Sequence, residues 1–131
     1  MTLRRLLLVL AGGTIGTAAR LALMLLIPDH GGFPFAILIA NIVGAFLIGV
    51  VAARLPASRD LRVFLATGIL GGFTTYSTFM TGTLALWADA PLVGAAYAVG
   101  SLVLGLVAAA VGLRIGRPRH DAGVRDAGVP S

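Results

Sequence analysis

The sequence predicts an all-α integral membrane protein with four transmembrane helices and a break in the third. Of the 131 residues, 58% are hydrophobic and only 11% are charged. This composition is typical of membrane proteins and excludes an ordinary soluble domain. A helix needs about 20 apolar residues to cross the hydrocarbon core, and suitable segments lie at 3–27, 35–54, 61–87 and 91–115. Residues 1–115 are therefore expected to form one four-helix membrane unit.

The first predicted span contains Arg20, an ionisable residue placed well inside the apolar segment. Arg20 follows Gly12 and Gly16 at intervals of four, so the three share one helical face. The glycines permit close approach of another helix. A charge at this depth needs a partner, a wet cavity or a nearby interface. A buried structural role and snorkelling to the interface stay open with equal weight.

The second predicted span places the carboxamide of Asn41 where hydrocarbon cannot satisfy it. Small residues follow at Gly44, Ala45 and Gly49. One interpretation makes Asn41 a hydrogen-bond clasp between helices, which is common in membrane bundles. The other makes its amide N–H a donor to an anion. For this residue alone the clasp is favoured.

The third predicted span contains the run Gly71-Gly72-Phe73-Thr74-Thr75-Tyr76-Ser77-Thr78-Phe79. A glycine break crowded with hydroxyls is tolerated in hydrocarbon only where protein encloses it or where it lines a polar cavity. Tyr76 and Phe79 share one face, and aromatic rings have electropositive edges. With hydroxyls such as Thr75 and Ser77 beside them, these edges can replace water around a small anion. Carbonyls freed by a break at the glycine pair can instead bind a cation.

The arginines indicate the orientation of the chain. All ten basic residues are arginine, and nine lie in the N-terminus, the second loop or the C-terminal region: Arg4, Arg5, Arg54, Arg59, Arg62, Arg114, Arg117, Arg119 and Arg125. Four crossings put these segments on one side, and short arginine-rich loops stay cytoplasmic. Both termini are therefore predicted to be cytoplasmic, with 116–131 as a disordered tail. Binding of nucleic acid or of lipid headgroups is disfavoured, because the arginines flank spans and form no compact patch.

Other functional classes find little support in the sequence. No nucleophile–base pair or metal-ligand cluster lies within the spans, so an enzyme is not expected. A proton-coupled exporter needs a titratable carboxylate inside the membrane. The five acidic residues are aspartates in loops or tail: Asp29, Asp60, Asp89, Asp121 and Asp126. A small four-helix cation or multidrug exporter is thus a weak alternative, and an accessory membrane subunit without its own transport is another.

The three motifs together resemble the CrcB or Fluc family of small fluoride channels. They are Gly12-Gly13-Thr14-Ile15-Gly16 through Arg20, Asn41-Ile42-Val43-Gly44, and the run at 71–79, and their order and spacing agree over about residues 3–115. The resemblance implies an antiparallel dimer in the inner (plasma) membrane, with two narrow pores through which cytoplasmic fluoride leaves passively. It also implies a structural sodium ion at the dimer centre, bound by main-chain carbonyls of Gly71 and Thr74.

The resemblance also implies individual roles. Asn41 matches the family's pore asparagine, Phe79 the second phenylalanine of its aromatic box, and Ser101 a hydroxyl of the track on the fourth helix. The expected pore residues are Asn41, Thr75, Tyr76, Ser77, Phe79 and Ser101, and the expected structural residues are Gly12, Gly16, Arg20 and Gly72. The chain departs from the family at three positions: Tyr76 replaces a phenylalanine, Gly82 stands where many members have glutamate, and Gly105 where another hydroxyl is expected.

The strength of the arginine bias bears on assembly. An antiparallel homodimer requires one sequence to insert in both orientations, and therefore a weak bias. Nine arginines on one side against none on the other is a strong bias. We therefore hypothesise that this chain inserts one way and pairs with a related subunit of opposite bias, as in family members encoded by paired genes.

Overall fold

A computed structural model describes residues 2–118 of the chain. Within these residues, four helical stretches are long and apolar enough to cross a membrane: Leu3–Leu26, Phe35–Arg54, Asp60–Asp89 and Pro91–Gly116. The predicted all-α fold with four spans is therefore confirmed. Helix α6 runs to Gly116, where the tail was predicted to begin. Most of that predicted tail, residues 119–131, lies outside the described part of the chain.

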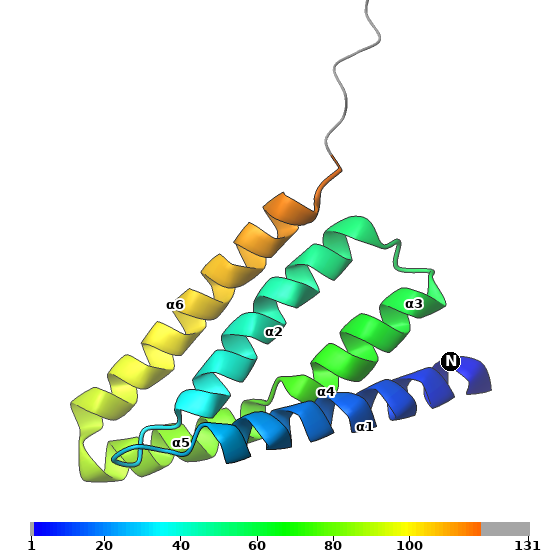
Figure 1. The fold of residues 1–131 in the computed structure, drawn as a ribbon. Coiled ribbons are helices and arrows are strands. Elements are labelled where there is room, and N and C mark those ends of the chain that lie inside the picture. The colour runs from blue at the N-terminus through cyan, green and yellow to red at the C-terminus, as the bar shows by residue number, and fades with distance from the viewer. Residues whose placement is uncertain (1, 119–131) are drawn as a thin grey trace, which may run out of the picture.

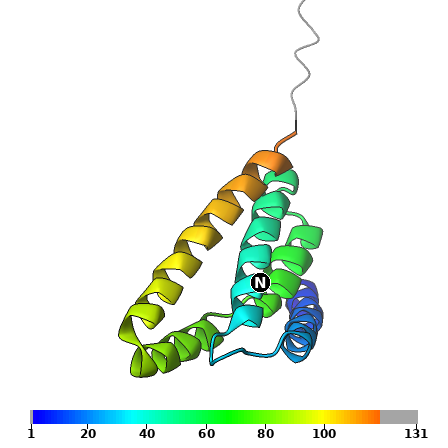
Figure 2. The ribbon, with the colours of Figure 1, turned by 60° about the vertical axis from the view of Figure 1, so that its left-hand side comes forward.

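Three spans are single helices and the third is composite. The single helices are α1 (Leu3–Leu26), α2 (Phe35–Arg54) and α6 (Pro91–Gly116). The third span consists of α3 (Asp60–Arg62), the π-helical segment η1 (Val63–Leu70), α4 (Gly71–Phe73) and α5 (Tyr76–Asp89). Helix α1 packs along η1 and α4, whereas α2 packs along α6 (Figure 1). Helix α5 diverges from α4 and packs against the N-terminal part of α6, as the turned view in Figure 2 shows.

Glycines bring α1 into backbone contact with the third span. A Cβ atom built at Gly12 would lie 2.7 Å from the carbonyl oxygen of Phe64, and one at Gly16 would lie 2.8 Å from the amide nitrogen of Phe73. Neither position has room for a side chain. The structure thus places both glycines of the first motif at a close helix crossing, the arrangement that small residues permit in membranes.

A second close crossing joins α2 to α6. A Cβ atom at Gly49 would lie 2.9 Å from the amide nitrogen of Leu113, and one at Gly112 would collide with the carbonyl oxygen of Phe46. The two helices run in the same direction and converge toward their C-terminal ends (Figure 2). Helix α5 packs against α6 of this pair, whereas η1 and α4 pack mainly against α1.

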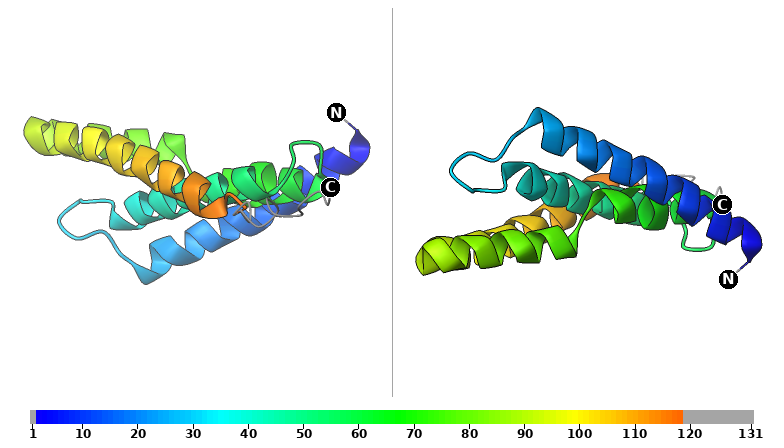
Figure 3. Two further views of the ribbon diagram at one scale, coloured as in Figure 1. Left: turned by 90° about the horizontal axis from the view of Figure 1, so that it is seen from above. Right: turned by 90° about the horizontal axis from the view of Figure 1, so that it is seen from below.

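The N-terminus, the loop after α2 and the C-terminal end of α6 lie toward one end of the molecule (Figure 1), and the turns after α1 and α5 lie together at the other (Figure 3). Ion pairs join two of these segments. Arg4 Nη2 is 3.0 Å from Asp60 Oδ2, and Arg5 Nε is 3.1 Å from Asp60 Oδ1. Arg5 also donates a hydrogen bond of 2.7 Å to the carbonyl of Ser58. The arginine-rich segments therefore share one end of the molecule.

At the opposite end, two short connections reverse the chain. Between α1 and α2, Gly31 and Gly32 have positive φ angles of 60° and 77°, and Phe33 donates a hydrogen bond of 3.1 Å to the carbonyl of His30. Side chains other than glycine rarely adopt this conformation twice in succession. Between α5 and α6, Pro91 stands at the start of α6, where its missing N–H costs nothing.

The buried core is small and lies between α2, α5 and α6. It contains Ile37, Phe79, Leu86 and Tyr97. Many large apolar side chains are exposed instead, including Leu92 at 86%. Such a surface suits lipid or another subunit, because apolar side chains are not expelled from hydrocarbon.

Candidate functional site

The helix of the third span is interrupted at Thr74 and Thr75. Both residues have extended backbone, with ψ angles of 155° and 127°. The predicted break is therefore present, but its predicted position at the glycine pair was wrong, since Gly71 and Gly72 belong to helix α4. The physical reason lies in the neighbouring helix: a Cβ atom at Gly72 would lie 2.9 Å from the Cα of Gly13. Gly72 serves close packing against α1 rather than a change of backbone direction.

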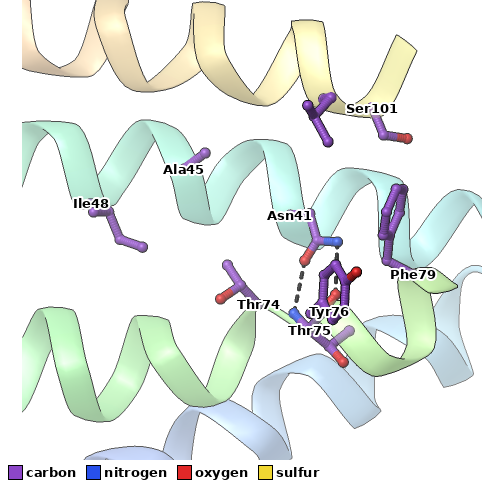
Figure 4. A pocket seen from close by; sticks show the side chains of 9 residues that line it. Asn41, Ala45, Ile48, Thr74, Thr75, Tyr76, Phe79 and Ser101 are labelled. Carbon is purple, nitrogen blue, oxygen red and sulfur yellow. Dashed lines mark hydrogen bonds between the residues drawn. The ribbon is translucent and has the colours of Figure 1, made fainter. Parts of the chain in front are cut away.

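The side chain of Asn41 connects α2 to the interruption. Its Oδ1 accepts a hydrogen bond of 2.8 Å from the amide of Thr75, and its Nδ2 donates one of 3.1 Å to the carbonyl of Thr75 (Figure 4). Because the backbone amide only donates and the carbonyl only accepts, these two bonds fix which way the carboxamide faces. The carboxamide nitrogen carries a second N–H, so Asn41 has one donor beyond the clasp.

Thr75 also begins helix α5. Its Oγ1 accepts a hydrogen bond of 3.3 Å from the amide of Thr78, which is the usual N-cap arrangement. The same oxygen lies 3.2 Å from Ser77 Oγ and 3.2 Å from Thr78 Oγ1. With 8% of its surface exposed, Thr75 is buried and its hydrogen-bonding capacity is largely used. Its role in this geometry is to hold the interruption in place.

These bonds remove the helical partners of two carbonyl groups. In a continuous helix, the carbonyl of Gly71 accepts from the amide of Thr75, and that of Thr74 accepts from the amide of Thr78. Here the Thr75 amide donates to Asn41 Oδ1 and the Thr78 amide donates to Thr75 Oγ1. The two carbonyls predicted as cation ligands are therefore among those that have lost their helical donors at the interruption. In residues 2–118 there is no group of three or more His, Cys, Asp or Glu side chains that could hold a metal ion.

An open cavity of about 340 Å³ lies beside the interruption, between α2, α5 and α6 (Figure 4). Its lining contains no charged residue and consists of Asn41, Ala45, Ile48, Thr74, Thr75, Tyr76, Phe79, Ser101 and Leu102. Five of the six predicted pore residues thus meet at one cavity. The sixth, Ser77, does not line it and instead lies against the hydroxyl of Thr75.

The two aromatic residues of the third span sit in different environments. Their ring centroids are 6.2 Å apart, but Phe79 is buried at 8% exposure whereas Tyr76 is 75% exposed. Phe79 also packs against Tyr97 of α6, with 5.6 Å between centroids. The rings of Phe79 and Tyr97 are thus packed within the protein, while that of Tyr76 is held by few neighbours.

Tyr97, which the sequence analysis missed, packs against Phe79 and lines a neighbouring cavity together with Ser101. Its side chain is buried, and its hydroxyl finds no hydrogen-bond partner in the part of the chain that the structure describes. The same holds for the buried hydroxyl of Ser101, one helical turn later on the same face. In the sequence, the signal for this pair was the presence of two hydroxyl-bearing residues four positions apart in an apolar span. Buried hydroxyls without partners are costly, so the pair points to a polar ligand or water at this place.

Two of the three departures, Gly82 and Gly105, lie apart from these contacts, as does Arg20, whereas Tyr76 lines the cavity. A Cβ atom at Gly105 would meet nothing within 4 Å, whereas one at Gly82 would lie 3.0 Å from Pro34. Gly82 borders a separate cavity that also includes Asp29. Arg20 is half-buried and forms no hydrogen bond or ion pair with the described residues. The two interpretations of Arg20 therefore both stay open.

The family model described as "CrcB-like protein, Camphor Resistance (CrcB)" matches residues 7–113. This chain belongs to the CrcB family. It is similar to the fluoride-specific ion channels FluC of Agrobacterium fabrum, with 43% identity over 117 residues covering 84% of this chain and 94% of that protein, and of Thermus thermophilus, with 43% identity over 121 residues covering 87% and 96%. A FluC protein of Brucella abortus is 40% identical over 121 residues, which cover 87% of this chain. The CrcB-family chain spans about half the length of that relative, since the match covers 45% of it.

Proposed function

We propose that this CrcB-family chain is a subunit of a fluoride-selective channel that lets cytoplasmic fluoride leave the cell passively and so reduces its toxicity. The observation that carries the proposal is the uncharged cavity at the interrupted third span, where amide, hydroxyl and aromatic groups meet. The names of the relatives, fluoride-specific ion channels, support the same ion. Ion channels are transporters, so no enzymatic activity is proposed.

The chemistry of the cavity suits a small anion. Fluoride is strongly hydrated, so a selective path must offer donors that replace its water at close range, and a larger halide fits such a path less well. The second N–H of Asn41 is one donor, and the ring edge of Phe79 is another electropositive group. The hydroxyls of Tyr76 and Ser101 add further donors. Because no fixed cation lines the cavity, a bound anion is not held too tightly to leave.

We further propose a structural sodium ion at the centre of an antiparallel dimer. The carbonyls of Gly71 and Thr74 support this site, because the amides that would normally bond them donate to side chains instead. Oxygen ligands are the type that hard cations prefer. When bound, sodium would supply a fixed positive charge and link the interrupted helices of two subunits.

The proposed partner is a related subunit of opposite orientation. Arg4 and Arg5 are joined to Asp60 and Ser58, so two of the three arginine-rich segments at this end, the N-terminus and the loop after α2, are directly linked. We propose that this end is cytoplasmic, because short arginine-rich loops stay on that side. A chain with such a bias inserts in one orientation, and an antiparallel dimer then needs a second kind of subunit.

The exporter alternative is not supported by the described residues. Asp60 begins the third span and Asp89 ends it, while Asp29 lies in the turn after α1. None of these carboxylates lies in the middle of a span. Proton-coupled export requires an ionisable group at that depth.

Fluoride efflux from liposomes, read with a fluoride electrode, tests the proposal. Three preparations are compared: this chain alone, this chain with a homologous subunit of opposite arginine bias, and empty vesicles. Efflux only from the mixture is the expected result. Efflux from the chain alone would support the channel but overturn the heterodimer, and efflux from neither would favour an accessory subunit.

A further inference from the structure

Three arginines at the C-terminal ends of α2 and α6 line one pocket at the arginine-rich end of the molecule. The open pocket has a volume of about 810 Å³ and is lined by Arg54, Arg114, Ile115, Gly116, Arg117 and Pro118. The sequence analysis expected no compact basic patch, and for these residues that expectation was wrong. The physical reason is the convergence of α2 and α6 (Figure 2). A Cβ atom at Gly116 would lie 2.9 Å from the carbonyl of Val50, so the two helix ends touch.

Unlike Arg4 and Arg5, the pocket arginines have no anionic partner among residues 2–118. Arg4 and Arg5 both pair with Asp60. Arg62 donates a hydrogen bond of 3.1 Å to the carbonyl of Leu55. No ion pair is found for the pocket arginines among the described residues, and the described acidic residues Asp29 and Asp89 lie at the opposite end of the molecule.

The charges of the helix ends do not neutralise this pocket. The C-terminus of a helix carries roughly half of a negative elementary charge, so α2 and α6 together offer about one. Three guanidinium groups carry three positive charges at any physiological pH. Among residues 2–118, a surplus of about two positive charges therefore remains at the pocket. That surplus matches one or two phosphodiester groups.

The position of the pocket decides between the possible sources of that phosphate. Arg54 is the last residue of the membrane-spanning helix α2, and Arg114 lies in the last turn of α6. The pocket therefore lies at the depth where a span leaves the hydrocarbon, which is the depth of lipid headgroups. Ile115 and Pro118 add apolar surface beside the guanidinium groups. We infer that this pocket binds the phosphodiester headgroup of an anionic phospholipid. The inference does not rest on the proposed transport of fluoride.

The test measures lipid binding to the purified full-length chain by native mass spectrometry, titrated with phosphatidylglycerol or phosphatidylcholine at one ionic strength. The double variant Arg54→Gln/Arg117→Gln removes two pocket charges. The matched control, Arg4→Gln/Arg59→Gln, removes two charges from the same end but outside the pocket. The pocket variant is expected to bind phosphatidylglycerol roughly thirtyfold more weakly, and the control is expected to bind it as the unmodified chain does.

Three results would overturn the inference. The first is an equal loss in both double variants, which would mean that only the total charge matters. The second is equal binding of the two lipids by the unmodified chain. The third is displacement of phosphatidylglycerol by millimolar inorganic phosphate, which would indicate a site for a soluble anion. If the glutamine variant does not fold, Arg54→Lys/Arg117→Lys keeps the charge but loses the bidentate fork. The lysine variant is then expected to bind phosphatidylglycerol several-fold more weakly than the unmodified chain does. An unchanged affinity would contradict binding of the headgroup in this pocket.

Discussion

Asn41 of helix α2 and Thr75 of the third span exchange two hydrogen bonds across 34 positions of sequence, 2.8 Å long at the Thr75 amide and 3.1 Å at its carbonyl. One side chain thus satisfies both backbone groups of a residue that no longer belongs to a helix. The position of the cavity relative to α2 follows from this contact. Four predictions concern this site and the contacts that support it.

Asn41→Ala is expected to destabilise the protein and abolish fluoride efflux. The substitution leaves the amide of Thr75 without a partner, which costs about 1–3 kcal/mol, and it removes one of the bonds to the Thr75 carbonyl, which as an N-cap carbonyl also accepts the first hydrogen bond of α5. Thermal unfolding in detergent and liposome efflux measure the two effects. Thr83→Val is the control, because the Thr83 hydroxyl donates only to Phe79 within its own helix. Equal destabilisation by both substitutions would contradict a special role for the clasp.

Tyr97→Phe is expected to leave stability nearly unchanged while reducing fluoride efflux. The Tyr97 hydroxyl is buried and has no partner in good hydrogen-bonding geometry within the described chain, so its removal costs little and keeps the packing against Phe79 and Phe33. The free energy of unfolding should change by less than about 0.5 kcal/mol. An unchanged efflux rate would show that the hydroxyl has no part in the path of the ion.

Gly112→Ala is expected to prevent stable packing of α2 against α6. The new methyl group would collide with the carbonyl of Phe46, and overpacking of this kind costs about 1–3 kcal/mol or more. Gly105→Ala on the same helix meets open space in the subunit and should be neutral or stabilising, since alanine has the higher helix propensity. The unfolding midpoints of the two variants compare these effects directly. Similar midpoints would argue against the helix crossing described above.

Asp60→Asn is expected to destabilise the protein slightly and in a salt-dependent manner. It removes the ion pairs with Arg4 and Arg5, whose side chains are 78% and 38% exposed, so the loss should stay below about 1 kcal/mol. The difference in unfolding midpoint should shrink in about 1 M salt. Asp89→Asn is the matched control, because Asp89 forms no ion pair within the described residues. A loss that is independent of salt would point to a role other than charge pairing.

The sequence predicted the architecture well and the site in part. Apolar segments of membrane-spanning length identified the four helices, because that length is imposed by the bilayer. Hydroxyls and glycines in the third span predicted an interruption, but whether a glycine bends its own helix or admits a neighbour depends on the neighbour. Gly72 faces Gly13, and this contact is not visible in the sequence.

The features that the sequence could not reveal all depend on packing between distant segments. Asn41 was favoured as a clasp, yet its partner Thr75 was not identified. From the sequence, Tyr97 was not distinguished from the other large residues of an apolar span. The π-helical segment η1 had no recognised signal, and such segments usually span a single turn. The arginine pocket arises only because Gly116 lets α2 and α6 meet.

The way in which the third span is interrupted bears on how fast an ion can move. The amides of Thr75 and Thr78 both have side-chain partners within the same chain. On the proposed function, an ion that enters the neighbouring cavity therefore breaks no helical hydrogen bond of these two amides. We therefore expect the permeation rate to be governed by the removal of water from the ion, with a temperature dependence typical of dehydration rather than of a conformational transition.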